Sequence, residues 1–335
     1  MSLFSIRCPR CSSENLKVHT VYTTQWGEAR SIYHCPVCAC FFSETYDTPQ
    51  AGLRTPLSRV QEILEALNDG LGVNAACRTF HVSKLTLRDW STRLAGLKEP
   101  LLLYALCHQF IQQLIEGDEL YTKVDRNLPP PESAGWTVVL MDRASRFLWA
   151  LDCGPKDQKL FKKALKTLAH VIEQTNDLSL VTDGERRYGN LLFEICRQVL
   201  RTGKPGRPRQ TLPKGVRVRV KNIGDQAHRR GRKRPKYEAP QPEHPDTPQT
   251  LVPQLIHANH VEAFNSALRR RLAAYRRKTN TYAKDVEALQ RRLDVYWLLH
   301  NFVRRHFTTK QVPAVALGVL EKGFSLSELF QMHYS

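Results

Sequence analysis

The order of apolar and polar residues predicts a unit of strands and helices in the middle of the chain. Between residues 110 and 200, short apolar runs alternate with longer stretches whose apolar positions repeat every three or four residues. The predicted strands cover residues 114–124, 136–142, 147–151 and 178–182, and the predicted helices cover residues 157–174 and 187–200. Three consecutive strands, a helix, a strand and a further helix are typical of a mixed sheet covered by helices.

Residues 55–98 have the apolar period of three short helices. The first ends at Gly70 or Gly72, because glycine favours the end of a helix. A second helix near residues 75–80, a turn at 81–82 and a third helix from Ser83 form the pattern of a helix-turn-helix, whose last helix enters the DNA major groove. The residues of that helix predicted to face outward are Ser83, Lys84, Thr86 and Arg88. The alternative interpretation is a small helical packing module.

Two cysteine pairs with Cys-x-x-Cys spacing lie in the first 50 residues. A stretch that alternates apolar and polar residues, as hairpin strands do, separates Cys8 and Cys11 from Cys35 and Cys38. Two such pairs joined by strands predict a zinc ribbon. Four thiolates in tetrahedral geometry suit Zn²⁺, and so small a segment has little core without the metal. The alternative is a group of buried thiols.

The same patterns divide the chain into several domains. They predict a zinc ribbon, a helix-turn-helix, an α/β unit and a C-terminal tail, at residues 1–50, 55–98, 105–310 and 311–335. Within the α/β unit, residues 201–256 are rich in proline and lack a sustained period, so they predict an insertion with one further strand at 216–223. Residues 285–307 predict an amphipathic helix that packs on the sheet.

Charge is concentrated in this insertion. The chain has a formal net charge of +18 and a pI of about 9.7. Between Arg201 and Lys236, 14 residues are Lys or Arg, and only Asp225 is acidic. Such an excess points to a polyanionic partner rather than to a plain metabolic enzyme. The many Gly and Pro residues disfavour the amphipathic helix that binding to a membrane surface needs, so we expect nucleic acid, with a solvated linker as the alternative.

The N-terminal residues and the overall hydropathy predict the compartment. The chain does not begin with a charged head followed by an apolar core, as a secretory signal does. No run of 18 uninterrupted apolar residues is present. We therefore expect a cytoplasmic protein without a membrane partner, whose nine cysteines are thiols or metal ligands.

Three acids occupy positions from which their side chains could meet. Asp118 lies in a predicted strand, Asp183 directly follows one, and Glu262 begins a helix rich in Arg, Lys and Ala. Three converging carboxylates would hold Mg²⁺ or Mn²⁺. Helical spacing also places basic side chains along the side of Glu262, where they would bind DNA phosphates. These basic residues are Arg269, Arg270, Arg276 and Arg277.

Each acid also has a structural interpretation. Taken alone, Asp118 or Asp183 is more often a strand-end cap or a turn former than a metal ligand. Glu262 could be a first-turn acid that complements the helix dipole. Other acids with a similar claim are Glu119, Asp142 and Asp152. The order of a strand acid, a post-strand acid and a helix acid beside a basic row favours the chosen set.

Three segments resemble a known enzyme family. DELYTKV, VTDGERRY and NHVEAFNSALRRRLAAYRRKTNTYAK look like the three acidic blocks of DDE transposases from bacterial insertion sequences, and the last block most resembles the insertion-sequence-one family. The predicted zinc ribbon and helix-turn-helix match that family's layout, whereas residues 201–256 are longer and more basic than its pattern. The resemblance implies a ribonuclease-H-like fold for the α/β unit.

The resemblance also implies roles for particular residues. It makes Asp118, Asp183 and Glu262 the metal-binding triad. It places Asn259, Arg269 and Arg276 near the active site or bound DNA.

The function implied is that of a DNA transposase in the bacterial cytoplasm, associated with the nucleoid. The zinc ribbon and the helix-turn-helix would recognise the terminal inverted repeats of the element, and metal-dependent cleavage and strand transfer would follow. Joining two double-stranded DNA ends implies a homo-oligomer. Two alternatives remain: a non-catalytic DNA-binding regulator derived from a transposase, and a ribonuclease-H-like nuclease without strand transfer.

Overall fold

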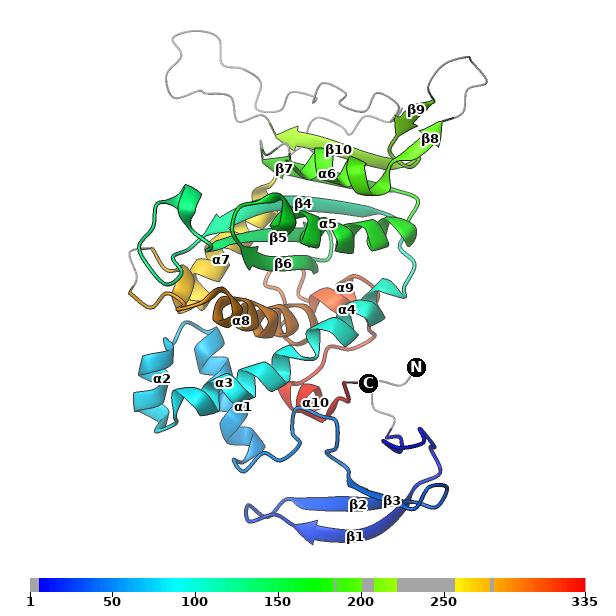
Figure 1. Cartoon of the computed structure of the whole chain (residues 1–335), viewed down its shortest axis with the longest axis vertical. Coiled ribbons are helices and arrows are strands. Elements are labelled where there is room, and N and C mark those ends of the chain that lie inside the picture. Colours follow the sequence, from blue (N-terminus) through cyan, green and yellow to red (C-terminus); the bar gives the residue numbers. More distant parts are fainter. Residues whose placement is uncertain are drawn as a thin grey trace.

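The part of the chain that the structure describes forms a three-stranded, a five-stranded and a two-stranded sheet, and helices lie between the first two (Figure 1). The computed structural model describes residues 6–183, 185, 187–200, 208–221, 257–277 and 280–334. A small three-stranded sheet lies at the N-terminal end, and a five-stranded sheet lies at the opposite end. The predicted mixed α/β architecture is confirmed. Most of the proposed basic insertion, residues 201–207 and 222–256, lies outside the described residues.

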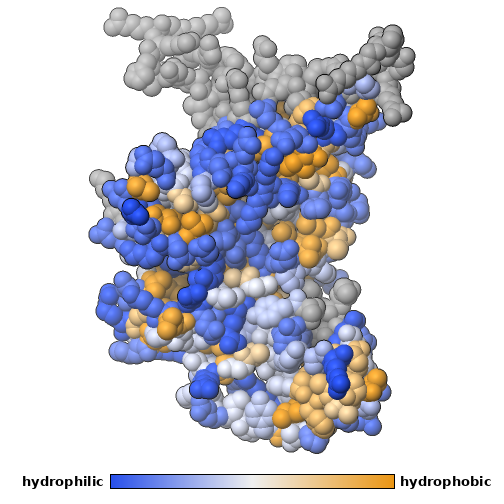
Figure 2. All heavy atoms as spheres, viewed as in Figure 1, coloured by the Kyte–Doolittle hydropathy of each residue, from blue (hydrophilic) through white to orange (hydrophobic). Residues whose placement is uncertain are grey.

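The N-terminal sheet is a meander with an exposed surface. Its strands β1 (Lys17–Thr23), β2 (Ala29–Cys35) and β3 (Cys40–Ser43) pair antiparallel in chain order. Apolar side chains stay exposed on this unit, among them Val18, Trp26, Val37 and Phe41. Figure 2 shows apolar surface gathered at this end of the molecule. The buried part is very small: Cys8, Cys35 and Phe42 form its own cluster, separate from the main core.

Four helices follow, α1 (Leu57–Asn68), α2 (Val73–Phe80), α3 (Lys84–Ala95) and α4 (Lys98–Leu106). The α1 face predicted to be apolar is buried through Val60, Ile63, Leu64 and Leu67. Between α2 and α3 the chain turns at His81, whose φ of 52° ends α2 in the left-handed conformation. Ser83 caps α3 by accepting a hydrogen bond from the backbone N–H of Thr86.

The five-stranded sheet consists of β4 (Gln113–Tyr121), β5 (Trp136–Asp142), β6 (Leu148–Gly154), β7 (Leu178–Asp183) and β10 (Val216–Lys221). Its spatial order is β10-β7-β4-β5-β6. The first three strands along the chain are antiparallel neighbours, whereas β7 and β10 run parallel to β4. The strand predicted at 216–223 is therefore present, next to the small hairpin of β8 (Gln198–Leu200) and β9 (Arg209–Thr211).

Helices cover both faces of this sheet. The helices α5 (Gln158–Glu173) and α6 (Arg187–Cys196) follow β6 and β7 in the chain. On β4, Gly117 points toward the side of Tyr188 on α6, where an added Cβ would lie 3.5 Å from the Tyr188 ring. Its neighbours Glu116 and Asp118 point to the other face, since side chains alternate along a strand. That face carries α7 (Asn259–Arg271), which continues into η3 (Ala273–Tyr275).

The edge strand β6 is covered by α8 (Val286–Leu298) and the π-helical turn η4 (Leu299–Val303). Trp297 Nε1 and Asn301 Nδ2 both donate to the Leu148 carbonyl, and Gln290 Nε2 donates to the Leu151 carbonyl. These side chains supply the hydrogen bonds that a further strand would otherwise provide. They thereby close an edge that could pair with another chain.

The C-terminal residues return to the helical region. They include α9 (Pro313–Ala316) and α10 (Leu326–Gln331), and Leu329 and Phe330 are fully buried. One continuous apolar core runs from α1 through the five-stranded sheet to α10. No helix among the described residues is both long and apolar enough to cross a bilayer.

A buried ion cluster also joins α4 to the sheet. Lys98 Nζ lies 2.6 Å from Asp294 on α8 and 3.5 Å from Asp152 on β6. Burial disfavours the charged amine, but these two carboxylates outweigh it and raise the pKa of Lys98.

Candidate functional site

The four cysteines predicted to bind zinc lie together. Their sulfur atoms all fall within 4.8 Å of one another, with Sγ distances of 3.3 Å between Cys8 and Cys38 and 3.5 Å between Cys11 and Cys35. Cys35 ends β2, and Cys38 lies in the turn that leads to β3. Antiparallel pairing of β1 with β2 sets Lys17 opposite His34, and so brings the second pair back toward the first, which precedes β1. The group could hold a structural metal such as zinc.

The pKa values of two of these thiols, Cys8 and Cys38, shift in opposite directions. Burial alone would raise the pKa of Cys8, but hydrogen bonds involving the backbone of Arg10 and Cys11 and the neighbouring thiols lower it to about 6. Burial and the hydrogen bond with Cys8 raise the pKa of Cys38 to about 12. Cys8 is therefore the first of these two to become a thiolate, the form that binds metal.

The second candidate site begins with two acids on neighbouring central strands. Asp118 lies on β4, and Asp183 is the last residue of β7. Gly117 pairs with Thr182 in the parallel register, so the next residues along the two strands are Asp118 and Asp183. The structure therefore brings these two backbone positions side by side. The side chain of Asp183 lies outside the described part.

The third acid is on α7, which crosses over β4. Asn265 Nδ2 donates to Asp118 Oδ2 at 2.7 Å, and the backbone N–H of Glu119 donates to Asp118 Oδ1 at 2.7 Å. Glu262 lies in the first turn of α7, three residues before Asn265, and its side chain is exposed. Residues three apart are neighbours on a helix surface, so Glu262 is one turn away from the contact with Asp118.

A buried acid that the sequence analysis did not select holds the start of α7. Glu116 is fully buried on β4, two residues before Asp118 and on the same face. Its Oε2 accepts hydrogen bonds from the backbone N–H groups of His260 and Val261 at 3.0 and 2.9 Å. Glu116 thus caps α7 from a neighbouring strand and satisfies two N–H groups of its first turn. No local pattern indicates this, because the partners are about 145 residues apart.

The other carboxylate oxygen of Glu116, Oε1, also has partners within the protein. Glu116 Oε1 accepts from Arg143 Nε at 2.6 Å and contacts His260 Nδ1 at 2.7 Å. Glu116, His257 and His260 have the ligand types and spacing of a metal group, with their atoms within 4.8 Å of one another. A cation at this point would nevertheless face the Arg143 guanidinium on the same carboxylate oxygen. We therefore interpret the cluster as a hydrogen-bonded anchor for α7.

The three acids named above as alternatives to the chosen set all have hydrogen-bond or ion-pair partners within the protein. Asp142 accepts hydrogen bonds from the backbone N–H and the hydroxyl of Ser145, and burial raises its pKa. Asp152 pairs with Lys98 and Lys163. Glu119 pairs with Lys156 at 3.0 Å. Asp142 thus stabilises a turn, whereas Asp152 and Glu119 form ion pairs.

The predicted recognition residues of α3 fall into two groups. Ser83 and Thr86 form the cap, with their hydroxyl oxygens 2.8 Å apart. Lys84 and Arg88 are exposed on the outer side. Leu87 and Trp90, on the inner side of the same helix, are buried. Two of the four side chains therefore hold the helix start, and two face solvent with a positive charge.

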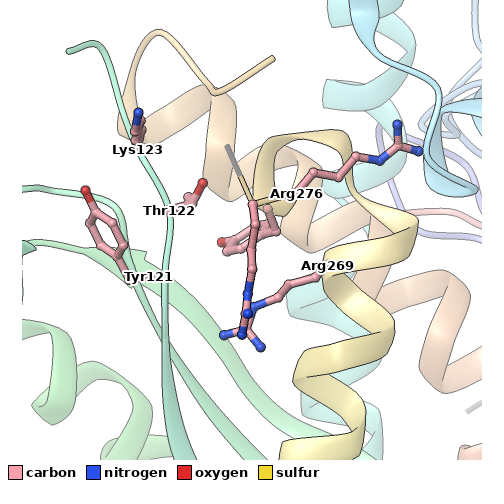
Figure 3. A pocket seen from close by; sticks show the side chains of 7 residues that line it. Tyr121, Thr122, Lys123, Arg269 and Arg276 are labelled. Atoms are coloured by element: carbon pink, nitrogen blue, oxygen red, sulfur yellow. The ribbon is translucent and has the colours of Figure 1, made fainter. Parts of the chain in front are cut away.

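Three of the four predicted phosphate-binding arginines line one cavity of about 310 Å³, together with the end of β4. The lining residues are Tyr121, Thr122, Lys123, Arg269, Tyr275, Arg276 and Arg277. Arg270 is exposed and is not among these lining residues. Figure 3 shows Arg269 reaching from α7 beside β4, while Arg276 extends the other way, toward the helical region.

Comparisons with known proteins found no family model that matches this chain and no curated protein that matches it.

Proposed function

We propose that this protein is a DNA transposase of an insertion sequence, with Asp118, Asp183 and Glu262 as its divalent-metal ligands. One observation carries the proposal: two acidic positions are adjacent on the central parallel strands, and the helix with the third acid is hydrogen-bonded to Asp118. Acids from three distant segments thereby belong to one region of the fold. The resemblance of the surrounding segments to DDE transposases supports the same assignment.

The sheet supports a ribonuclease-H-like catalytic domain. Three antiparallel strands followed by two parallel ones, with the first strand at the centre, are the arrangement we associate with that fold. Carboxylates at the centre of such a sheet suit Mg²⁺ or Mn²⁺, which prefer oxygen ligands.

Metal bound there would supply Lewis-acid activation of a phosphodiester and of the attacking water or 3′-hydroxyl. The residues of the chain would orient the reacting groups. Glu116 and Asn265 hold α7 on β4 at two points, so Glu262 is carried by a helix of fixed register. The exposed Glu262 side chain suits a ligand that must meet DNA at the protein surface.

The N-terminal units would bind the element ends. The four-cysteine group suits structural Zn²⁺, which would order a sheet that has almost no core of its own. The turn between α2 and α3, with Lys84 and Arg88 exposed beyond it, suits a helix-turn-helix that enters a major groove. The net charge of +18 favours a double-stranded DNA partner, and joining two ends requires an oligomer.

The experiment incubates the full chain with DNA that carries the element ends, and with Mg²⁺. Nicking followed by joining supports the transposase, nicking alone indicates a nuclease, and binding alone indicates a regulator. Glu262→Gln is expected to abolish cleavage with DNA binding retained. Glu287→Gln is the matched control, because Glu287 is an exposed acid in the first turn of another helix, α8. Cleavage retained in Glu262→Gln would exclude Glu262 as a ligand.

A further inference from the structure

We propose that Lys156 is a positioning residue for the acidic site of Asp118, Asp183 and Glu262. It joins the end of β4 to the chain that follows β7, and so fixes the separation of the two strand acids. The inference rests on the proposed function and adds to it a residue that acts through the strands rather than on the metal. Lys156 lies in the short connection between β6 and α5, and therefore comes from neither of the strands that it joins.

The backbone pairing between the two acid-bearing strands stops just before the acids. β4 and β7 pair in parallel as far as Gly117 and Thr182, and the next residues are Asp118 and Asp183. Two like charges at neighbouring positions repel one another. A link between the strands beyond the last backbone pair would oppose the separation that this repulsion favours.

Lys156 supplies such a link directly beyond the acids. Its Nζ lies 3.0 Å from Glu119 Oε2 and 3.6 Å from Glu185 Oε2. Glu119 immediately follows Asp118, and Glu185 comes two residues after Asp183. The side chains of Glu119 and Glu185 are only 10% and 17% exposed, so water screens this bridge less than it screens a surface ion pair.

The bridge lies on the face of the sheet opposite to the Asp118 side chain. Glu119 shares its side of β4 with Gly117, because side chains alternate along a strand. That side faces α6, where a Cβ added to Gly117 would lie 3.5 Å from the Tyr188 ring. Asp118 points instead toward α7. Lys156 can therefore act on Asp118 through the backbone of β4, which makes it a positioning residue and not a metal ligand.

Lys156 is itself confined by the elements around it. The next residue, Asp157, caps α5 with its side chain and so defines the backbone turn. The Lys156 ammonium lies 4.3 Å from the centre of the Trp136 ring on β5. Arg187 Nη1 donates to the Lys156 carbonyl at 2.8 Å, and Arg187 Nε donates to the Glu185 carboxylate at 3.1 Å. Both the backbone and the charged end of this lysine are thus held in place.

Negative charge is concentrated around the first turn of α6. Tyr188 is fully buried, and burial raises its pKa first, followed by the charges of Glu119, Asp118 and Glu185. Three acids that act on one phenol also repel one another. The ammonium of Lys156 offsets this repulsion, so removal of its charge should let the strand ends move apart.

The test compares Mn²⁺ binding by the full chain, supplied with zinc, in the wild type and in lysine variants. Electron paramagnetic resonance of free Mn²⁺ gives the affinity without DNA, and Asp118→Asn identifies the binding that belongs to the acidic site. Lys156→Met removes the charge but keeps the length of the side chain. It should weaken Mn²⁺ binding about 10-fold, as loss of groups that orient metal ligands commonly does. Lys156→Arg keeps the charge and should bind Mn²⁺ like the wild type.

The matched control is Lys162→Met on α5. It also removes a lysine from an ion pair, in this case an exposed one with Glu194, and should keep the wild-type affinity for Mn²⁺.

A second measurement separates positioning from loss of folding. Urea unfolding shows which variants are folded under the binding conditions, and hydrogen exchange followed by mass spectrometry reports on the end of β7. In Lys156→Met, amides at the end of β7 should exchange faster than in the wild type, whereas those of β5 should keep their rate. Glu185→Gln breaks only the β7 side of the bridge. It should change both the exchange and the Mn²⁺ affinity in the same direction.

Two kinds of result would overturn the inference. One is a Mn²⁺ affinity of folded Lys156→Met equal to that of the wild type, or an equal loss in Lys162→Met. The other is a loss that Lys156→Arg does not reverse, because the positive charge would then not be the cause.

Failure of the proposed function looks different. Mn²⁺ binding that depends on Asp118 would then persist and would respond to Lys156→Met, but no DNA would be cleaved. A wild type without such Mn²⁺ binding would overturn both the proposed function and the inference.

Discussion

The side-chain amide of Asn265 donates a 2.7 Å hydrogen bond to the carboxylate of Asp118 and so joins α7 to the central strand of the sheet. Asn265 is only 2% exposed. Asp118 is one of the two acidic positions that parallel pairing places side by side. The contact therefore decides where the first turn of α7, with Glu262, lies relative to those positions.

Replacing Asn265 by Ala should weaken the attachment of α7 to β4. The substitution removes a buried donor and leaves the Asp118 carboxylate with one fewer hydrogen bond, which we expect to cost about 1–3 kcal/mol of unfolding free energy. Urea denaturation measures this change in the free energy of unfolding. Asn190→Ala on α6 is the control, because Asn190 is exposed, and should change stability by less than about 0.5 kcal/mol. Equal losses in the two variants would contradict the role assigned to Asn265.

Glu116→Gln should destabilise the fold more strongly. The amide can accept on one oxygen only, so Arg143 or the two backbone N–H groups of α7 lose their buried partner. We expect a cost of about 3–5 kcal/mol. Glu194→Gln, which breaks the exposed pair with Lys162, should cost less than about 1 kcal/mol.

The same variant distinguishes an anchor from a metal site. If Glu116 is an anchor, the metal content of folded Glu116→Gln equals that of the wild type, as measured by mass spectrometry of the elements. Loss of one metal ion per chain would instead make Glu116, His257 and His260 a metal centre, against our interpretation.

Cys35→Ser should remove metal from the N-terminal unit. A structural Zn²⁺ needs four thiolates here, and Cys35 is fully buried within the group. We expect the zinc content to fall, and protease cleavage within residues 6–50 to become faster because the unit has little other core. Cys107→Ser is the control, since Cys107 is exposed and outside the group. Unchanged zinc content in Cys35→Ser would refute the assignment.

His300 should make stability depend on pH. Burial lowers its pKa from 6.5 to about 4, and its Nε2 lies 2.9 Å from the Arg146 carbonyl oxygen. Between these two pKa values the unfolded chain binds the proton and the folded chain does not. The contribution of His300 to the free energy of unfolding is therefore fully present above about pH 6.5. It declines by about 3 kcal/mol as the pH falls to about 4.

The measurement compares unfolding of wild type and His300→Gln across this pH range. The glutamine amide can donate to the same carbonyl but does not titrate, so the difference in stability between the two proteins should shrink as the pH falls. His170→Gln, at an exposed histidine on α5, should follow the wild type at every pH. A difference that stays constant with pH would contradict a neutral His300 in the folded protein.

Gly70→Ala should lower the free energy of unfolding by more than the positive φ of this residue alone explains. Gly70 has a φ of +104°, and a Cβ there would lie 2.8 Å from the Arg270 carbonyl oxygen and closer still to Arg276. We expect a loss of about 1–3 kcal/mol by thermal or urea unfolding. Gly27→Ala also has positive φ, at +81°, but no atom lies within 4 Å of its Cβ. Its cost should be about 1 kcal/mol, from strain only.

Local patterns in the sequence were sufficient for most of the elements. Apolar runs and helical periods predicted the strands near 136–142 and 178–182 and the helix near 157–174, because burial of one face imposes these periods. Boundaries differed where local signals were weak. The strand β6 extends to Gly154, and the helix expected to reach residue 200 ends at Cys196 before β8.

By itself, the sequence determined the order of strands and helices, the pairing of cysteines by spacing, and the location of the basic residues. These depend on neighbours in the chain. Only the tertiary structure decided that Glu116 caps α7, that Asn265 reaches Asp118, and that Gln290 covers an edge strand. Such contacts join residues more than 130 positions apart, and their energy depends on burial and orientation that no local pattern encodes.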